Sequence, residues 1–397
     1  MIATHGFFLW KVREQIARGD PDFTVFYTAG KMLREGRGSE LYSSRAQQAV
    51  QGEFARNPEI RRGPLPYIHP PFEALFFLPL TFLTYPYAFG LWNLINVAIL
   101  FGVVAMLRNS QSALQGIPVW QMVLLSLAFF PIFANFHQGQ DAILLLLVVS
   151  LSFRALDRGA DLLAGGWLAL GLFKYHLILP LAVILAVWRG RKFIVGFATV
   201  SLGLVLVSLG LVGWKGALQY PIYAWRVASG PAFGGIPPRQ LPSLFGLLGG
   251  WPISQRIGLA VQVAVVACSA GVLVMVATLR KWAQSKVFPQ LCFGVAVIAA
   301  ALVAYSTNTY DLSLLVVPLA VVANYALAGR RNVRWLLAPA TPLLISPLWF
   351  FLWMRWGRIN VMAVFLVWWL FVLVAEVRRL GNAAETASHE SPVIANV

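Results

Sequence analysis

Long apolar runs separated by short polar stretches make up most of the chain, and many are long enough to cross a membrane as helices. A spanning helix needs roughly 20 mostly apolar residues, and charges occur only at the ends of these runs. The pattern predicts spans near residues 86–107, 117–136, 140–156, 192–212, 256–279, 288–305, 311–328, 334–353 and 359–376. A shorter, proline-bounded run at 72–84 predicts a helix that lies against the membrane surface or dips into it.

The apolar run 161–188 differs from the others because Lys174 lies near its centre. A single span would hold this ammonium group at mid-bilayer, at a cost of about 2.5–3.5 kcal/mol on insertion scales. Arg154 and Arg158 precede the run and Arg189 follows it, and the positive-inside rule expects both flanks in the cytoplasm. Two short helices that meet at Lys174 satisfy both constraints. Each half is roughly 20 Å long, too short for a hydrocarbon core of about 30 Å, so we expect Lys174 in an outward-facing recess.

These runs predict an all-α, polytopic integral membrane protein with about 10–12 membrane helices, counting the short pair around Lys174. Residues 1–379 are expected to form one membrane domain with external loops at 20–70 and 213–255. Residues 380–397 are expected to form a disordered cytoplasmic tail. No span is visible before 20–70, so either the N-terminus is external or a further helix precedes this chain.

The composition excludes an ordinary soluble domain. Apolar residues make up 59% of the chain and charged residues 12%, whereas soluble domains carry about 25% charged residues. The net charge of +16 comes from 31 Lys and Arg against 15 Asp and Glu. Cytoplasmic loops of membrane proteins accumulate such cations, so we expect a lipid bilayer rather than nucleic acid as the partner. Cys268 and Cys292 lie inside apolar runs and predict neither a disulfide nor a metal cluster.

With this topology, the unusual polar residues fall on the outer side of the membrane. They are Asp20, Asp22, His69, His137, Gln138, Gln140, Asp141, Lys174, His176, Arg239, Ser243, Tyr310 and Asp311. Lys174 is a functional candidate because ionisable residues at membrane depth usually serve function. Asp22 lies in a Gly-Asp-Pro-Asp-Phe stretch rather than at a span end, which favours function. His176 can join Lys174 only where the chain turns, because residues two apart do not share a helix face.

Other members of this set have plain structural explanations. Asp141 and Asp311 each open a span, where a carboxylate suits the helix dipole. Capping is the favoured role for Asp141, whereas capping and function are equal alternatives for Asp311. His69 and His137 are more typical of interface histidines than of metal ligands, and the histidines show no metal spacing.

Short motifs also follow one another in a fixed order over about residues 22 to 320. They are Asp22-Phe23, Phe26-Tyr27, Ala29-Gly30, Leu41-Tyr42, His69-Pro70-Pro71-Phe72, Leu91-Trp92, Asn96, Gly139-Gln140, Phe173-Lys174, Pro242-Ser243-Leu244, Gly246 and Tyr310-Asp311-Leu312. In this order they resemble glycosyltransferase family 87, which consists of polyprenyl-phosphate-mannose-dependent mannosyltransferases with the GT-C membrane fold. The order is more specific than any single motif.

The resemblance implies an inverting transfer of a hexose, typically mannose, from a polyprenyl-phosphate carrier to a glycolipid or polysaccharide acceptor. It also implies a multi-pass protein of the cell (inner) membrane with its active face outside the cytoplasm. The catalytic aspartate of the family lies in the first external loop, and the matching position is Asp22. The Phe-Lys motif of the family matches at Lys174.

The implied chemistry needs a base for the acceptor hydroxyl and positive charge at the leaving phosphate. Asp22 is the expected base. The phosphate is expected to contact Lys174, His176 and Arg239. Sugar hydroxyls are expected to contact Gln138, Gln140, Tyr310 and Asp311. No cofactor and no metal are expected, and a divalent cation, if used, would suit Asp22 and Asp311.

The chain departs from the family pattern at several places. Tyr175-His176 stands where Pro-Gln is usual, His69 replaces a tyrosine, Ser243 and Phe245 stand where Asn and Arg are frequent, and no first membrane helix is visible. These departures leave the donor sugar and acceptor open more than the chemistry. Two other classes of function stay open. One is a transporter or lipid flippase with Lys174 as a substrate or gating charge, and the other is a non-catalytic membrane scaffold.

Overall fold

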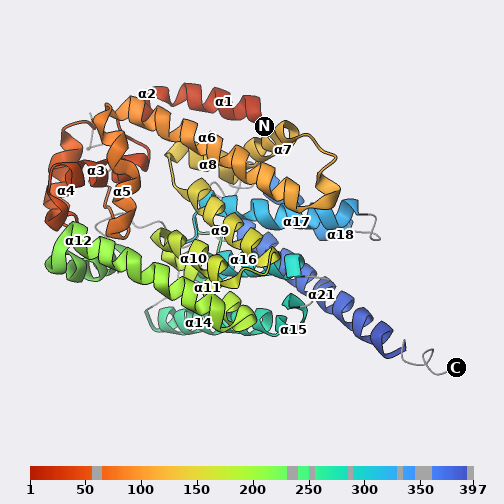
Figure 1. Cartoon of the computed structure of the whole chain (residues 1–397). Coiled ribbons are helices and arrows are strands. Elements are labelled where there is room, and N and C mark those ends of the chain that lie inside the picture. The colour runs from red at the N-terminus through yellow and green to blue at the C-terminus, as the bar shows by residue number, and fades with distance from the viewer. Residues whose placement is uncertain are drawn as a thin grey trace.

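The computed structural model describes residues 1–55, 65–229, 240–249, 255–284, 289–328, 334–344 and 360–390, in which all regular structure is helical (Figure 1). The all-α prediction is confirmed. The longer helices are α1 (Ile2–Lys11), α3 (Phe23–Arg34), α4 (Ser44–Gly52), α6 (Tyr85–Ser110), α7 (Val119–Ala128), α8 (Phe130–Gln138), α9 (Ala142–Asp157), α10 (Asp161–Ala169), α11 (Tyr175–Arg189), α12 (Arg191–Ser229), α14 (Gln255–Ala277), α16 (Pro289–Val303), α17 (Val316–Leu327) and α21 (Val361–Glu390). Short helices connect them: α2 (Arg13–Ala17), η1 (Gly38–Glu40), η3 (Pro71–Glu73), α5 (Ala74–Phe77), η4 (Leu78–Phe82), η5 (Ser112–Leu114), η6 (Leu170–Lys174), α13 (Leu244–Gly249), α15 (Arg280–Ala283), η9 (Thr309–Leu315), α18 (Arg334–Leu337) and α19 (Thr341–Leu344).

The chain is a polytopic membrane protein by the length and hydropathy of its helices. Six described segments are long and apolar enough to cross a membrane, or seven if the bent pair α7–α8 counts as one span. Counted by length and composition only, the six are Tyr85–Ser110, Asp161–Arg189, Arg191–Val227, Gly258–Ala277, Thr309–Leu327 and Val361–Thr386, of which Asp161–Arg189 is folded back on itself. The expected total of about 10–12 also counted shorter helices such as α9 and α16, which have 16 and 15 residues. The predicted span 334–353 lies mostly outside the described residues.

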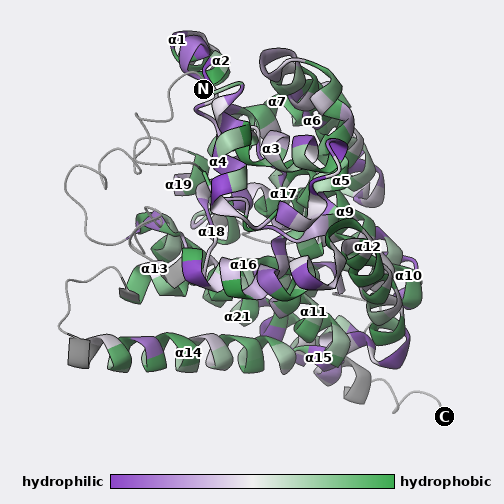
Figure 2. Cartoon of the chain, turned by 90° about the vertical axis from the view of Figure 1, so that its left-hand side faces the viewer, coloured by the Kyte–Doolittle hydropathy of each residue, from purple (hydrophilic) through white to green (hydrophobic). Residues whose placement is uncertain are grey.

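Two long helices present apolar side chains to the outside of the molecule. On α12, Leu202 and Leu206 are 61% and 60% exposed, and on α14, Leu259 and Val263 are 67% and 60% exposed. Both helices run along the side of the molecule opposite α1 and α6 (Figure 1), and α14 is apolar along most of its length (Figure 2). Soluble proteins rarely expose apolar faces of this size, so these faces contact lipid.

The segment 161–189 is a hairpin rather than one straight span. Arg189 at its end pairs with Asp161 at its beginning, with Nη2 2.7 Å from Oδ1, which a straight helix of this length would keep about 40 Å apart. The chain turns at Lys174, whose φ of −113° and ψ of 59° are not helical. The predicted pair of short helices meeting at Lys174 is confirmed.

The hairpin is held against α12 by a close backbone crossing. A Cβ atom on Gly165 of α10 would overlap the Phe193 carbonyl of α12, and one on Gly196 of α12 would overlap the Leu162 carbonyl. Small residues allow membrane helices to approach in this way. The crossing therefore fixes the position of the turn that carries Lys174.

The predicted span 117–136 is broken into two helices, α7 and α8, which meet at 74°. Phe129 between them has extended backbone angles. Pro131, the second residue of α8, has no N–H group, so it cannot donate the hydrogen bond that would continue α7 into α8. The Leu127 carbonyl beside the break accepts a hydrogen bond from His5 Nδ1 of α1 at 3.3 Å. A histidine of α1 thus donates a hydrogen bond to a carbonyl group that the break leaves without its helical partner.

Segments expected to be loops or disordered contain helices. The first expected external loop, 20–70, holds α3 and α4, and the second, 213–255, contains the part of α12 beyond its kink at Gly213. The tail expected to be disordered from residue 380 continues α21 to Glu390. Phe23 and Phe26 of α3 pack on the Phe77 ring, with centroids 6.2 and 4.5 Å away. This packing anchors the beginning of α3, where Asp22 lies.

Candidate functional site

Lys174 is the centre of a buried polar cluster. Its Nζ lies 2.9 Å from Asp141 Oδ1, 3.0 Å from Asp311 Oδ1 and 3.3 Å from Gln140 Oε1. It also lies 4.9 Å from the centroid of the Tyr310 ring. Lys174 is 3% exposed and both aspartates are fully buried. Three oxygen atoms therefore surround an ammonium group that has three N–H donors.

The turn between α8 and α9 brings Gln140 and Asp141 to this cluster. Gly139 has a φ of 60°, in the left-handed region that favours glycine. A Cβ at this position would lie 2.8 Å from Phe23 Cβ and 2.8 Å from the Phe89 ring. The Trp92 indole N–H bonds the carbonyls of Gly139 and Gln140, at 3.0 and 3.2 Å. Steric contacts and hydrogen bonds therefore both hold the turn in this conformation.

Gln140 joins Asp22 to Lys174. Its Nε2 donates to Asp22 Oδ2 at 2.8 Å, while its Oε1 accepts from Lys174 Nζ. Gln138 accepts a hydrogen bond from the Asp22 backbone N–H at 3.1 Å. Asp22 directly precedes α3 and is partly exposed, so its carboxylate is oriented by Gln140 and still accessible. The amides predicted to bind sugar hydroxyls are thus also engaged in positioning Asp22.

Asp141 does not cap α9, contrary to the favoured sequence interpretation. The Asn135 side-chain oxygen accepts from the N–H groups of Ala142 and Ile143 instead, at 3.0 and 3.3 Å. Asp141 is therefore free to pair with Lys174. Asp311 both caps its helix and pairs with Lys174, because its Oδ2 accepts a hydrogen bond from the Asn308 N–H at 2.8 Å while its Oδ1 faces Lys174.

The turn at Lys174 also brings His176 into the cluster, with Nε2 4.0 Å from Asp311 Oδ2. The structure therefore gathers all the predicted site residues that it describes: Asp22, Gln138, Gln140, Lys174, His176, Tyr310 and Asp311. Arg239 lies outside the described residues.

A fourth carboxyl group, that of Glu73, lies beside Asp141 and was not among the residues predicted from the sequence. Glu73 is fully buried, and its Oε2 is 2.9 Å from His69 Nδ1 and 3.4 Å from the Tyr67 hydroxyl. Burial, and then the neighbouring Asp141, raise the pKa of Glu73 well above its usual value. Burial lowers the pKa of His69 to about 4, so its ring is neutral. The available signal was that Glu73 is the one charged residue in the apolar run 72–84.

His69, Glu73 and Asp141 form a group that could hold a metal ion, since their ligand atoms lie within 4.8 Å of one another. This is the one such group found in the part of the chain that the structure describes. The sequence predicted no metal site, and the pair named there as suiting a divalent cation, Asp22 and Asp311, is not part of this group.

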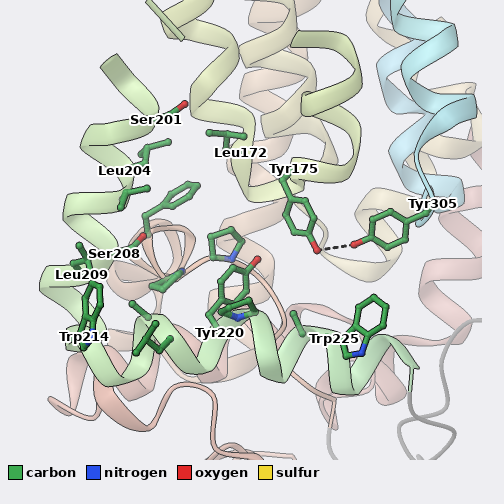
Figure 3. Close-up of a pocket in the computed structure, with 18 of the residues that line it drawn as sticks. Leu172, Tyr175, Ser201, Leu204, Ser208, Leu209, Trp214, Tyr220, Trp225 and Tyr305 are labelled. Carbon is green, nitrogen blue, oxygen red and sulfur yellow. Dashed lines mark hydrogen bonds between the residues drawn. The ribbon is translucent and has the colours of Figure 1, made fainter. Parts of the chain in front are cut away.

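A large apolar cavity adjoins the hairpin turn (Figure 3). Its volume is about 1080 Å³, at the upper end of the range for small-molecule pockets. The walls come from α12, the hairpin and the Pro70–Phe72 segment, and include Leu172, Leu204, Leu209, Trp214, Pro221 and Trp225. The Tyr175 and Tyr305 hydroxyls, 2.7 Å apart, are hydrogen-bonded to each other at one end of it, and Tyr220 of α12 also lines it (Figure 3). An apolar chain with a polar head suits this lining.

The model of glycosyltransferase family 87 matches residues 67–306, more than half of the 397-residue chain. The matched region contains Glu73, Gln140 and Lys174. Asp22 and Asp311 lie outside it and join the site through Gln140 and Lys174. No curated protein and no solved structure matches the chain.

Proposed function

Because the chain belongs to glycosyltransferase family 87, we propose that it transfers a hexose, with mannose as the expected sugar, from a polyprenyl-phosphate carrier. The acceptor is a glycolipid or polysaccharide on the outer side of the cell membrane. The GT-C architecture accompanies this proposal. The observation that carries it is the Gln140 link between Asp22 and the buried Lys174 cluster, beside a large apolar cavity.

Asp22 acts as the base. The acceptor hydroxyl oxygen attacks the anomeric carbon from the side opposite the phosphate and gives its proton to the Asp22 carboxylate. The bond between the anomeric carbon and the phosphate oxygen breaks, and polyprenyl phosphate leaves with the electron pair. The configuration is inverted. Partial exposure of Asp22 and the hydrogen bond from Gln140 support this role, because they leave the carboxylate accessible and oriented.

Lys174 and His176 stabilise the phosphate end of the donor. All three oxygen partners of Lys174 are protein groups, so a phosphate oxygen must replace one of them. Gln140 is the partner to be displaced, because its contact is the longest at 3.3 Å and carries no charge. The released Gln140 oxygen can then accept a hydrogen bond from a sugar hydroxyl, which agrees with the role expected for it.

The apolar cavity receives the polyprenyl chain. Its aliphatic and indole walls suit hydrocarbon, and the hydroxyls of Tyr175 and Tyr305 offer polar contacts where the carrier ends in phosphate. Tyr175 directly follows Lys174, which supports the approach of the head group from this cavity.

The test is transfer itself. Membranes containing the chain are incubated with a panel of radiolabelled polyprenyl-phosphate hexoses, and the labelled product and its anomeric configuration are identified. The expected result is an inverted glycoside made most rapidly from the mannose donor. Label that crosses the membrane without forming a new glycosidic bond would instead support the flippase alternative, which family membership does not favour.

A further inference from the structure

His69, Glu73 and Asp141 bring three metal-binding groups together beside Lys174. Their ligand atoms lie within 4.8 Å of one another. His69 and Glu73 flank the Pro70–Pro71 turn, and Asp141 begins α9. The Tyr67 hydroxyl contacts both the Pro70 carbonyl and Glu73, at 2.8 and 3.4 Å. Tyr67 therefore holds the part of the group that carries Glu73 in place.

The charges of this group do not balance within the described residues. Glu73 and Asp141 are fully buried, and Lys174, which adjoins Asp141, is shared with Asp311. Glu73 Oε1 and Asp141 Oδ2 have no N–H or O–H donor among the other described residues, and the two carboxyl groups are close enough to share a hydrogen bond when one of them is protonated. Adjacent buried carboxylates strongly disfavour each other in a low dielectric, so a proton or a cation must lie between them.

The set of donors favours a metal cation. One imidazole nitrogen and two carboxylate oxygens are the ligand types of Zn²⁺ and Mn²⁺ sites. The His69 side chain is 19% exposed, so the group has an open side. Three protein ligands leave coordination positions free for an outside oxygen, as in catalytic zinc sites.

The expected donor adds a second reason. A glycosyl phosphate is an anion, and among the described residues Asp141, Asp311 and Glu73 outnumber the one lysine at this cluster. A proton on Glu73 would still leave two aspartates against Lys174 and the titratable His176, whose Nε2 lies 4.0 Å from Asp311 Oδ2. A divalent cation would give the cluster the positive charge that binds and stabilises a departing phosphate.

We propose that His69, Glu73 and Asp141 bind one divalent ion, Zn²⁺ or Mn²⁺, whose open positions accept an oxygen of the donor phosphate. The metal site depends on the three ligands alone. Its role toward phosphate rests on the proposed function.

Metal content tests the site without any assay of transfer. The full chain, purified in detergent with any affinity tag removed, is equilibrated with ZnCl₂ or MnCl₂, freed of loose metal and analysed by mass spectrometry. About one ion per chain is expected. Retention of neither metal by a chain that runs as a single folded species overturns the site and leaves a shared proton between Glu73 and Asp141.

Ligand variants locate the ion. His69→Gln, Glu73→Gln and Asp141→Asn should each weaken binding at least about tenfold, whereas His137→Gln, a histidine outside the group, should keep wild-type metal content. Glu73→Gln keeps the shape of the buried side chain and removes its charge. Unchanged metal content in the three ligand variants overturns the assignment. If only aggregating variants lose the metal, the wild-type chain is titrated with a chelator. The chelator should remove the ion reversibly while the chain stays folded.

The phosphate role has its own readout. With Mn²⁺ bound, polyprenyl phosphate should change the electron paramagnetic resonance spectrum of the ion, and lipid lacking the phosphate should not. An unchanged spectrum overturns the phosphate contact. A chain that binds one ion and polyprenyl phosphate but transfers no sugar refutes the proposed function and leaves the metal site standing.

Discussion

At the scale of single residues, the buried position of Lys174 changes what its removal should do. Its loss would leave Asp141 and Asp311 buried without a counter-ion. Breaking a buried charge cluster by removing one partner costs about 3–5 kcal/mol. Lys174 therefore has a structural role in this site in addition to the proposed contact with the donor phosphate.

We predict that Lys174→Met lowers the thermal unfolding midpoint of the purified chain strongly, by the equivalent of about 3–5 kcal/mol. Adding Asp311→Asn should recover part of this loss, because the second variant removes one of the unpaired charges. Lys192→Met, at an exposed lysine, serves as the control and should melt like the wild type. A Lys174→Met protein with the same thermal unfolding midpoint as the control would show that the buried ion pairs contribute nothing to stability.

Asp22→Asn tests the base. The asparagine keeps the oxygen that accepts from Gln140 but cannot take a proton, so kcat should fall by about 10²–10⁴-fold with little change in donor binding. Asp20→Asn, two residues earlier, should stay within a few-fold of wild type. Equal rates for Asp22→Asn and wild type in the labelled-sugar assay would remove Asp22 from the reaction.

At the scale of elements, the turn between α8 and α9 is the joint on which the site depends. Gly139 has a left-handed backbone and a side-chain position already filled by Phe23 and Phe89. The same turn aims Gln140 at Asp22 and Asp141 at Lys174.

Gly139→Ala should therefore destabilise the chain by more than about 1 kcal/mol and reduce transfer as well, because Phe23 and the adjacent Asp22 must shift. Gly102→Ala on α6, where a Cβ meets nothing within 4 Å, is the matched control and should be neutral or slightly stabilising. Thermal unfolding and initial transfer rates, measured together, check both effects. Identical melting of the two variants would contradict the steric argument.

The hairpin predicts that both of its outer flanks lie on one side of the membrane. Cysteines placed at the exposed positions Arg158 and Arg191, in a chain lacking Cys268 and Cys292, should react with an impermeant maleimide from the same side. We expect that side to be the cytoplasm. Labelling of the two positions from opposite sides would mean that 161–189 crosses as one span.

Sequence reasoning found this hairpin because charge is a strong signal at membrane depth. Lys174 disfavours a single span through its insertion cost, and the flanking arginines disfavour it through the positive-inside rule. The break at Phe129 gave no such signal, because proline in a membrane helix is often tolerated when neighbours satisfy the freed groups. Here the neighbour is His5, more than a hundred residues earlier in the chain.

The same limit applies to the site. Asp22, Lys174 and Asp311 were predicted because of unusual position or family motif. Asp141 was assigned to capping, since a carboxylate at a helix start has a sufficient local explanation, and only the three-dimensional arrangement shows that Asn135 already fills that role. Glu73 has no local signal beyond its charge, and its partners come from distant segments.

At the scale of the whole molecule, the polar cluster and the apolar cavity lie next to each other but are built by different parts of the chain. The cluster comes from α3, the α8–α9 turn, the hairpin turn and η9. Much of the cavity wall comes from α12. Changes to the cavity should therefore affect carrier binding without disturbing the charges.

Ala217→Trp fills part of the cavity from α12. It should raise the KM for a long-chain polyprenyl-phosphate donor at least several-fold and leave the KM for a short-chain analogue nearly unchanged. Leu206→Trp, at a side chain of the same helix that is 60% exposed, is the matched control and should change the KM for neither donor. Equal effects of Ala217→Trp on both donors would mean that the carrier chain lies elsewhere.

The short hairpin affects where the head group of an apolar lipid substrate can contact water. Each of its helices covers about two thirds of the normal hydrocarbon thickness, so we expect the aqueous boundary beside the turn to lie roughly 10 Å deeper than in the surrounding bilayer. For the proposed polyprenyl-phosphate donor, this depth would bring water to the phosphate while the isoprenoid chain stays in the hydrocarbon core. Isoprene units beyond the length of the cavity would stay in ordinary lipid, and lengthening the carrier further should then add no affinity.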